Sequence, residues 1–437
     1  MTTIPKSNGR SARSARCRLV KRILLTLVTF AILYNISPID SDALSSGRLA
    51  MLSLLLYLAL TGRPIYRAHD WKPLLIFLPL PYVILQYALV YDPGQLSRFA
   101  HLALYSLVGA SIVARLAGSL EDLLKIILTA ITIQAVIILY SFGSLEYRAW
   151  FESSVLSGTN FQASDLYRAP GLTSTGGSAL SVIQSLGVMV GGTLLFLRQP
   201  ARSPVPIILL MLLCALSCVV VGRTGLLLSS VFLVMFCVGA GYAWGLLAVG
   251  GSLVVALFVS LPHFAELMPS GFSTDNFLNW ALGFFLSGTD ESVVDLASMP
   301  VHALAPLDAM VGTGLISPIA GGNPSGHDSG FVQAYFSMGL LMSTAFYALY
   351  ALVLLHLLRW LPITLKWTLA AMFFAIEIKE PFVFKYGTMF VLVAIYSSIL
   401  RSGSVRALRD RTRASEVPPP EHRLSSASGS FRSHGRY

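Results

Sequence analysis

Charged residues are scarce in this chain. Of its 437 residues, 12% are Asp, Glu, Lys or Arg and 55% are hydrophobic, and the mean hydropathy is +0.70. A soluble globule of this length needs more polar surface than these side chains supply. The composition therefore argues against a soluble protein and predicts a polytopic membrane protein.

Cysteine is also scarce, with four residues in the whole chain. Cys17 lies in a basic segment, whereas Cys214, Cys218 and Cys237 lie within apolar runs. A disulfide framework needs cysteines in oxidising loops, and a zinc site needs a second pair of ligands. We expect neither of these, and we interpret the three cysteines in apolar runs as packing residues.

Basic residues are missing from residues 263 to 329, which form the longest polar interruption in the chain. This segment contains seven carboxylates and no Lys or Arg. Short cytoplasmic connections retain Lys and Arg, and translocated connections exclude them. We therefore expect residues 263–329 to lie outside the cytoplasm and to carry extracytoplasmic chemistry.

Apolar runs of about 20 residues, the length that a helix needs to cross a bilayer, recur along the chain. They predict an all-α protein with about 12 transmembrane helices, near residues 19–36, 47–61, 74–90, 99–117, 123–142, 178–197, 204–221, 225–240, 243–262, 330–355, 362–378 and 382–400. The second run is weak and Pro79 and Pro81 make the third irregular. Counts of eleven to thirteen therefore stay open.

The distribution of basic residues indicates the orientation. A cytoplasmic amino terminus puts 24 of the 31 Lys and Arg residues in the tails and the cytoplasmic loops, as the positive-inside rule requires. An even number of spans then returns the carboxyl terminus to the cytoplasm. The same register predicts two long periplasmic loops, at about 143–177 and 263–329.

The chain divides into a basic cytoplasmic tail at 1–18, a transmembrane domain at 19–400 and a second basic cytoplasmic tail at 401–437. No small-residue cleavage site follows the first apolar run, so we expect that run to remain as a signal-anchor helix. The second tail is rich in Pro, Ser, Gly and Arg and is expected to be disordered. We interpret the net charge of +10 as tails near anionic lipid that orient the protein, and expect no nucleic-acid partner.

Four charged groups are expected at the periplasmic ends of helices: Arg168, Arg223, His327-Asp328, and Glu377 to Glu380. Arg223 lies in a turn of a few residues between two apolar runs, which leaves its guanidinium near hydrocarbon. A charge at the bilayer centre costs about 2.5–3.5 kcal/mol, and less near an interface. This cost favours a functional role, and snorkelling to lipid head groups is the alternative.

Four short segments suggest a family: Arg168-Ala169-Pro170-Gly171-Leu172, Gly222-Arg223-Thr224-Gly225-Leu226-Leu227, His327-Asp328-Ser329-Gly330-Phe331 and Ile378-Lys379-Glu380-Pro381-Phe382. With these segments the chain resembles the bacterial Wzy-type polysaccharide polymerases and the related O-antigen ligases. The likeness covers roughly residues 100 to 400. It implies a GT-C-like fold and a glycosyltransferase at the periplasmic face of the bacterial inner membrane.

The resemblance also implies a reaction and its partners. A glycan moves from an undecaprenyl diphosphate carrier to an acceptor hydroxyl. The expected partners are the undecaprenyl-diphosphate-linked glycan, membrane lipid, a chain-length regulator, and flippase or export proteins.

Cationic side chains bind phosphate oxygens, so the expected ligands of the carrier diphosphate are Arg168, Arg223 and Lys379. A positioned base removes the proton of an acceptor hydroxyl, so the expected catalytic residues are His327, Asp328 and Glu380. Neutral His327 is the preferred base, with Asp328 orienting it or taking its place. Two structural readings stay open: Asp328 or Ser329 caps the helix after it, and Lys379 and Glu380 form an ion pair.

Several alternatives differ in their sequence requirements. A ligase places an amide or hydroxyl residue after the histidine, where this chain has Asp328, so polymerase is favoured. Residues 263–329 lack the arginines that polymerases often carry in both large loops. This argues against a mechanism in which arginines of both loops bind the substrate through its charge. A lipid-linked oligosaccharide flippase would concentrate polar groups near the midplane. The carboxylates lack the spacing of a metal site, so we expect a metal-independent enzyme without a cofactor.

Overall fold

The computed structural model describes residues 8–38, 44–61, 71–155, 168–174, 177–197, 203–239, 291–317 and 324–402. These residues form helices and their connections. Among them no β-strand occurs beyond an isolated antiparallel bridge between Pro38 and Val155. The all-α prediction is therefore confirmed for the part of the chain that the structure describes.

Helices occur at eleven of the twelve predicted spans, and the twelfth, at 243–262, lies outside the described residues. The helices are α1 (Asn8–Tyr34), α2 (Ser46–Thr61), the 3₁₀ helix η2 (Lys72–Phe77) with α3 (Leu80–Val90), α4 (Gly94–His101) with the π-helix η3 (Leu102–Gly109) and α5 (Ala110–Ala117), α6 (Leu120–Gly143), α8 (Gly177–Leu197), α9 (Val205–Val219), α10 (Arg223–Gly239), α15 (Gly330–Leu357), α16 (Ile363–Lys379) and α17 (Tyr386–Ser402). Three shorter helices lie in the predicted long loops: α7 (Leu145–Ser154), α13 (Glu291–Ser298) and α14 (Pro306–Val311).

Five helical segments in the described part are long and apolar enough to cross a membrane: Lys72–Val90, Gly94–Ala117, Leu120–Gly143, Gly177–Leu197 and Gly330–Leu357. Shorter apolar helices, of 10–17 residues, accompany them. The chain is thus an all-α membrane protein. The count of about 12 spans, the GT-C-like arrangement and the orientation stay predictions.

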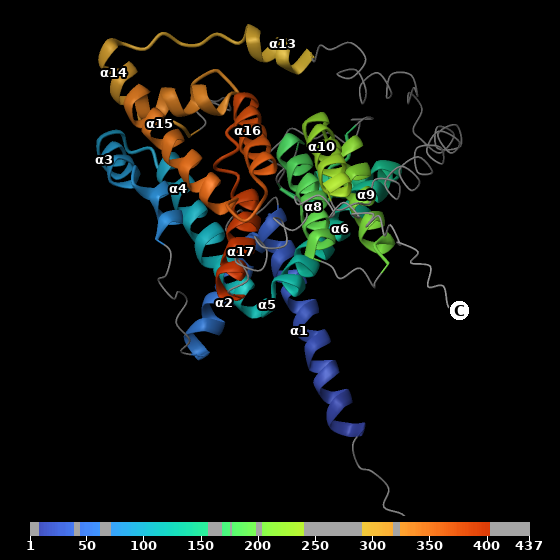
Figure 1. Cartoon of the computed structure of the whole chain (residues 1–437). Coiled ribbons are helices and arrows are strands. Elements are labelled where there is room, and N and C mark those ends of the chain that lie inside the picture. Colours follow the sequence, from blue (N-terminus) through green and yellow to red (C-terminus); the bar gives the residue numbers. More distant parts are fainter. Residues whose placement is uncertain are drawn as a thin grey trace, which may run out of the picture.

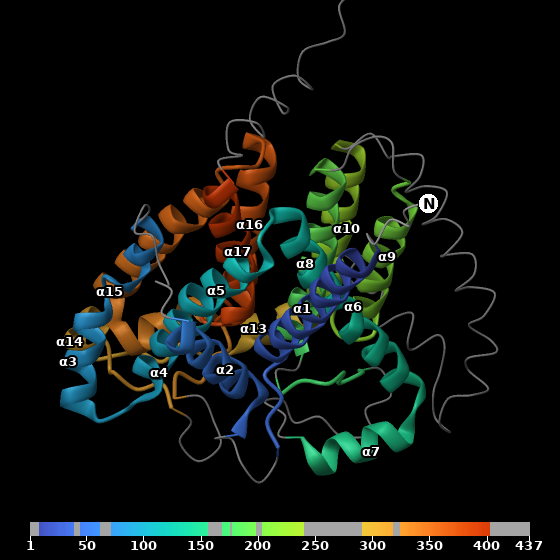
Figure 2. The same cartoon turned by 90° about the horizontal axis from the view of Figure 1, so that it is seen from below.

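The helices form two groups with a central seam (Figures 1 and 2). α6, α9 and α10 surround α8, and α15 packs with η2, α14 and α16 on the other side. α17 contacts α5, η3 and α6 between the two groups. α8 is almost completely buried because small and apolar residues cover all its faces, so it is the centre of its group.

α15 is interrupted at Gly339, whose φ of 74° is outside the helical region. The break frees backbone carbonyls, and two loop residues bind them: the N–H of Thr313 donates to Phe336 O and that of Gly314 to Ser337 O, both at 2.9 Å. A side chain at Gly312 would lie 2.4 Å from the nitrogen of Gly339. The end of the large loop, at Thr313 and Gly314, therefore lies in the break of α15. Its N–H groups satisfy the helix carbonyls that the break frees.

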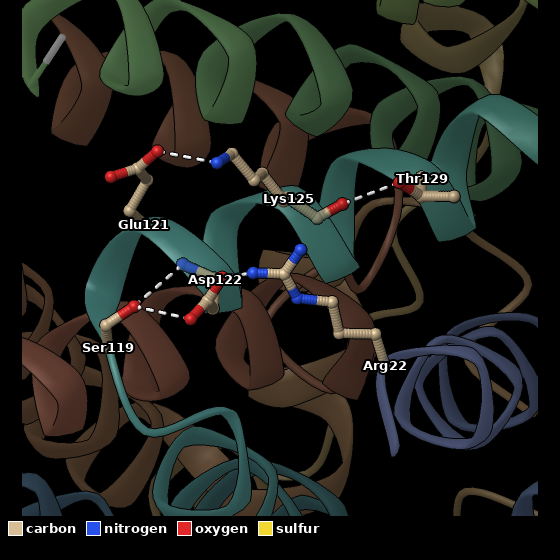
Figure 3. Close-up of polar contacts among 6 residues, drawn as sticks. All are labelled: Arg22, Ser119, Glu121, Asp122, Lys125 and Thr129. Carbon is tan, nitrogen blue, oxygen red and sulfur yellow. Dashed lines mark hydrogen bonds and ion pairs between the residues drawn. The ribbon is translucent and has the colours of Figure 1, made fainter. Parts of the chain in front are cut away.

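The bundle has a basic end, at which α1 meets the start of α6 (Figure 3). Arg22 forms an ion pair with Asp122, and Lys125 forms one with Glu121. Ser119 is the N-cap of α6 and accepts the N–H of Asp122 at 3.1 Å, which explains why the helix begins there. These charges are mostly exposed. Lys125 and Glu121 are one turn apart on α6, whereas Arg22 reaches Asp122 from the middle of the neighbouring α1.

The bundle has a second end, at the carboxyl-terminal end of α1, which we call the site end. Thr173 donates to Tyr34 O at 2.6 Å, and the N–H of Ser37 donates to Ser174 Oγ at 2.8 Å. α8 begins three residues after Ser174. The end of the first predicted loop therefore lies at the end of α1 that is remote from Arg22.

Candidate functional site

The Gly222–Gly225 turn positions Arg223 against α8. The N–H of Gly225 donates to Ser181 Oγ at 3.1 Å, and a Cβ at Gly225 would lie 2.2 Å from Ser181 O. Only glycine fits this approach, so the sequence folds the start of α10 tightly onto the start of α8. Arg223, the first residue of α10, is half-buried there.

Arg168 lies beside the same turn. The N–H of Ala169 donates to Val220 O at 2.8 Å, and Ala169 and Pro170 are buried while Arg168 is exposed. The backbone bond therefore fixes the segment, and the guanidinium extends from it. Two arginines that are 55 positions apart in sequence are thus attached to one short turn at the site end.

Glu380, the C-cap residue of α16, joins this group. Ser178 Oγ, on the first turn of α8, donates to Glu380 Oε1, and Lys385 Nζ lies 3.4 Å from Glu380 Oε2. Lys385, which the motif segments do not include, is thus a salt-bridge partner of Glu380. Lys379 is the last residue of α16 and is half-buried. We call Arg168, Arg223, Ser178 and Glu380 the arginine group.

His327 lies in a tight turn before α15. It is 7% exposed, and its ring accepts the backbone N–H of Ser329 at Nδ1, 3.0 Å away. Ser325 Oγ accepts the N–H of His327 at 3.3 Å. Asp328, in contrast, is exposed. The two adjacent side chains therefore occupy different environments.

The structure partly tests the hypothesis that Asp328 or Ser329 caps the helix after the turn. Ser329 occupies the N-cap of α15, but no side-chain hydrogen bond accompanies it. Gly330, the first helical residue, has no room for a side chain, because a Cβ would lie 2.2 Å from Glu377 Oε1. The start of α15 is therefore set by close packing against the end of α16.

Gln333 and Arg98 support the turn. Gln333 Nε2 donates to the carbonyl oxygens of His327 and Asp328 at 3.3 and 3.2 Å. Arg98 Nη2, from α4, donates to Gln333 Oε1 at 3.2 Å, and its guanidinium lies over the ring of Phe384. Because both sides of the Gln333 amide are bound, its orientation is determined.

Glu377 is a fully buried carboxylate next to this turn. Tyr347 OH donates to its Oε1 at 2.7 Å and the N–H of Val383 donates to its Oε2 at 2.8 Å. A buried carboxylate needs such donors to offset the loss of hydration. We call His327, Gln333, Arg98 and Glu377 the histidine group. α16 connects the two groups, since Glu377 and Glu380 lie at the same helix end.

Asp92, between α3 and α4, anchors the end of the large loop. It accepts the backbone N–H groups of Ile316, Ser317 and Gly94 at 2.6–2.8 Å, and also the hydroxyl of Ser317. Burial raises the pKa of Asp92, but these hydrogen bonds outweigh burial and lower the pKa from 3.8 to about 2. The loop that leads to His327 is therefore tied to the bundle at a carboxylate.

Sequence reasoning missed four residues of the site: Ser178, Gln333, Arg98 and Glu377. Arg98 lies outside the four motif segments, and Glu377 directly precedes the segment Ile378-Lys379-Glu380-Pro381-Phe382. The sequence signal that could have indicated Arg98 and Glu377 is that each is a charged residue next to an apolar run, where a charge is energetically costly. Nothing in the local sequence pairs Arg98 with Gln333, because the two are 235 positions apart.

Metal ligands do not gather in the described part of the chain, where no group of three or more His, Cys, Asp and Glu residues could hold a metal ion. Metal independence stays a prediction. Comparison of the chain with protein-family models, curated proteins and solved structures finds no match.

Proposed function

We propose that this protein polymerises undecaprenyl-diphosphate-linked oligosaccharide repeat units into a surface polysaccharide or exopolysaccharide. The reaction takes place at the periplasmic face of the bacterial inner membrane, with both termini in the cytoplasm. The observation that carries the proposal is the arginine group: backbone contacts hold the segments of two arginines near the start of α8, and the carboxylate of Glu380 bonds to the same helix start at Ser178. The motif resemblance supplies the substrate class.

The proposed chemistry uses cationic and proton-accepting groups together. Arg168, Arg223 and Lys379 bind the carrier diphosphate, because guanidinium and ammonium groups stabilise the negative charge that develops on a leaving phosphate. A group among His327, Asp328 and Glu380 accepts the proton of the attacking hydroxyl. The arginines supply positive charge that a metal supplies in other transferases.

A reconstituted reaction tests this function. Purified full-length protein in lipid vesicles receives a lipid-linked oligosaccharide, and the products are separated by size. We expect a ladder of multiples of the repeat unit. Arg168→Ala and Arg223→Ala remove the ladder, whereas Arg22→Ala at the basic end retains it at matched protein level.

Other outcomes identify other functions. Transfer of one glycan to a lipid acceptor without a ladder would indicate a ligase. Movement of the lipid-linked glycan across the vesicle membrane without new glycosidic bonds would indicate a transporter. In cells, deletion of the protein should leave single repeat units in place of long chains.

A further inference from the structure

The bond at Nδ1 determines where the proton of a neutral His327 ring lies. The backbone N–H of Ser329 donates to Nδ1 at 3.0 Å. A backbone N–H is always a donor, so Nδ1 must present a lone pair to it. A neutral imidazole carries one proton on its two nitrogens. In this arrangement that proton is on Nε2.

The turn around the ring is restrained on several sides. Ser325 Oγ accepts the N–H of His327 and donates to its carbonyl oxygen at 3.1 Å. Gln333 donates to the same carbonyl, and Arg98 binds the other end of the Gln333 amide. These bonds hold the backbone on both sides of the ring and so keep the N–H of Ser329 close to Nδ1.

We propose that His327 acts through Nε2–H as a hydrogen-bond donor to the reacting substrate, not as the base that the motif suggests. This inference rests on the proposed function. Arg98 and Gln333 are positioning residues that preserve the donor geometry. A fixed donor aimed at a leaving diphosphate stabilises the charge that develops in the transition state.

The proton acceptor is then Asp328. Glu380 already accepts a hydrogen bond from Ser178 and pairs with Lys385, so both of its carboxylate oxygens have partners. Glu377 is fully buried. Asp328 is the exposed carboxylate of the turn, and Gln333 holds its backbone carbonyl at 3.2 Å.

The step balances as follows. The acceptor oxygen forms a bond to the anomeric carbon, and the bond from that carbon to the phosphate oxygen breaks. The bonding electron pair leaves with undecaprenyl diphosphate, which accepts a hydrogen bond from Nε2–H. The proton of the acceptor hydroxyl passes to the Asp328 carboxylate and is later released to water.

The tautomer can be measured without any substrate. Full-length protein with ¹³C,¹⁵N-labelled histidine is examined by NMR in lipid bilayers, at a pH high enough to keep its histidines neutral. Comparison with the spectrum of His327→Gln identifies the His327 signals. We expect a protonated Nε2 and an unprotonated Nδ1. A proton on Nδ1 overturns the proposal, whatever reaction the protein catalyses.

The positioning role uses the same spectra. Gln333→Met and Arg98→Met should give a mixture of the two tautomers, because the turn loses its support. Gln95→Met is the control for Gln333, since Gln95 is a buried glutamine on α4 that contacts Met338. Arg359→Met is the control for Arg98, since Arg359 also stacks on an aromatic ring but at the basic end. Unchanged tautomers in Gln333→Met and Arg98→Met would remove both residues from this role.

Polymerisation assays then test the donor. Glutamine can donate from a nitrogen near the place of Nε2 but cannot accept a proton, and asparagine is too short to reach it. We expect His327→Gln to retain at least about a tenth of the activity with an unchanged pH profile, and His327→Asn to lose about 10²-fold or more. Asp328→Asn should lose about 10²- to 10⁴-fold. Equal loss in both histidine variants, or an active Asp328→Asn, contradicts the mechanism.

The two proposals fail in different ways. An Nε2–H tautomer in a protein that forms no glycosidic bonds would sink the proposed function and leave the structural assignment standing. A ladder of products from a protein with a proton on Nδ1 would do the reverse.

Discussion

The two ends of the bundle use similar charged residues in different environments. At the basic end, the side chains of Arg22 and Asp122 are 53% and 30% exposed, and the pair joins the middle of α1 to the first turn of α6 (Figure 3). At the site end, Glu377 is fully buried and accepts bonds from a tyrosine hydroxyl and the backbone. Exposed pairs contribute little to stability, whereas buried carboxylates depend on every partner. Charge at the basic end is therefore expected to orient the protein, and charge at the site end to act on substrate.

The largest expected difference between the ends is access from outside the cell. In a Cys17→Ser background, Ser153→Cys at the end of α7 should react with an impermeant thiol reagent in intact spheroplasts. Glu121→Cys at the start of α6 should react only after lysis, because the charge distribution puts that end in the cytoplasm. Labelling of Glu121→Cys in intact spheroplasts would show that the orientation is the reverse of the predicted one, and would exclude a periplasmic site.

The next largest difference concerns the guanidinium of Arg223. Arg223→Lys keeps the charge but loses the planar fork that binds two phosphate oxygens, so we expect polymerisation to fall at least about tenfold. Arg22→Lys at the basic end should keep its activity, because an exposed pair needs only the charge. Equal activity of the two lysine variants would make Arg223 a topological anchor. Initial rates with a lipid-linked oligosaccharide decide between these outcomes.

Loss of a carboxylate should also affect the two ends unequally. Glu377→Ala leaves the hydroxyl of Tyr347 and the N–H of Val383 without their acceptor, and each unsatisfied buried donor costs about 1–3 kcal/mol. Asp122→Ala should cost less than about 1 kcal/mol. Thermal unfolding in lipid vesicles compares the two variants. Glu377→Gln, which retains one acceptor oxygen, should fall between them, and a wild-type melting temperature for Glu377→Ala would contradict the assigned contacts.

The smallest effect is the pH dependence of the loop anchor. The pKa of Asp92 is lowered from 3.8 to about 2 in the folded protein. Its contribution to stability is therefore present above pH 3.8 and is lost as the pH falls towards 2. The difference corresponds to about 2 kcal/mol. Unfolding between pH 5 and pH 2 should show this extra loss in the wild type and not in Asp92→Asn, and parallel curves for the two proteins would exclude the anchor.

The positions of the helices could be predicted from the sequence because apolar run length is a local property. Helices occur at every predicted span within the described residues, and Arg168, Arg223, His327 and Glu380 lie at one end as expected. Local boundaries were less accurate. α1 begins at Asn8, well before the predicted start at residue 19, because its basic segment continues the helix beyond the apolar run.

The broken α15 could not be predicted from its apolar pattern, which is continuous across Gly339. The break depends on the loop at Thr313 and Gly314, whose N–H groups bind the freed carbonyls. The contact at the His327 ring could not be predicted from its motif for a similar reason. A histidine in a motif suggests a base, but its tautomer depends on which nitrogen the fold engages.

By itself, the sequence determined the membrane character, the helix positions and the gathering of charges near helix ends, because composition and run length act locally. Tertiary structure decided the partners: Arg98 with Gln333, Ser178 with Glu380, and Tyr347 with Glu377. These pairs join different helices, and no periodicity along one helix encodes which face of another it meets. The arrangement of charge into two connected groups is therefore a property of helix packing.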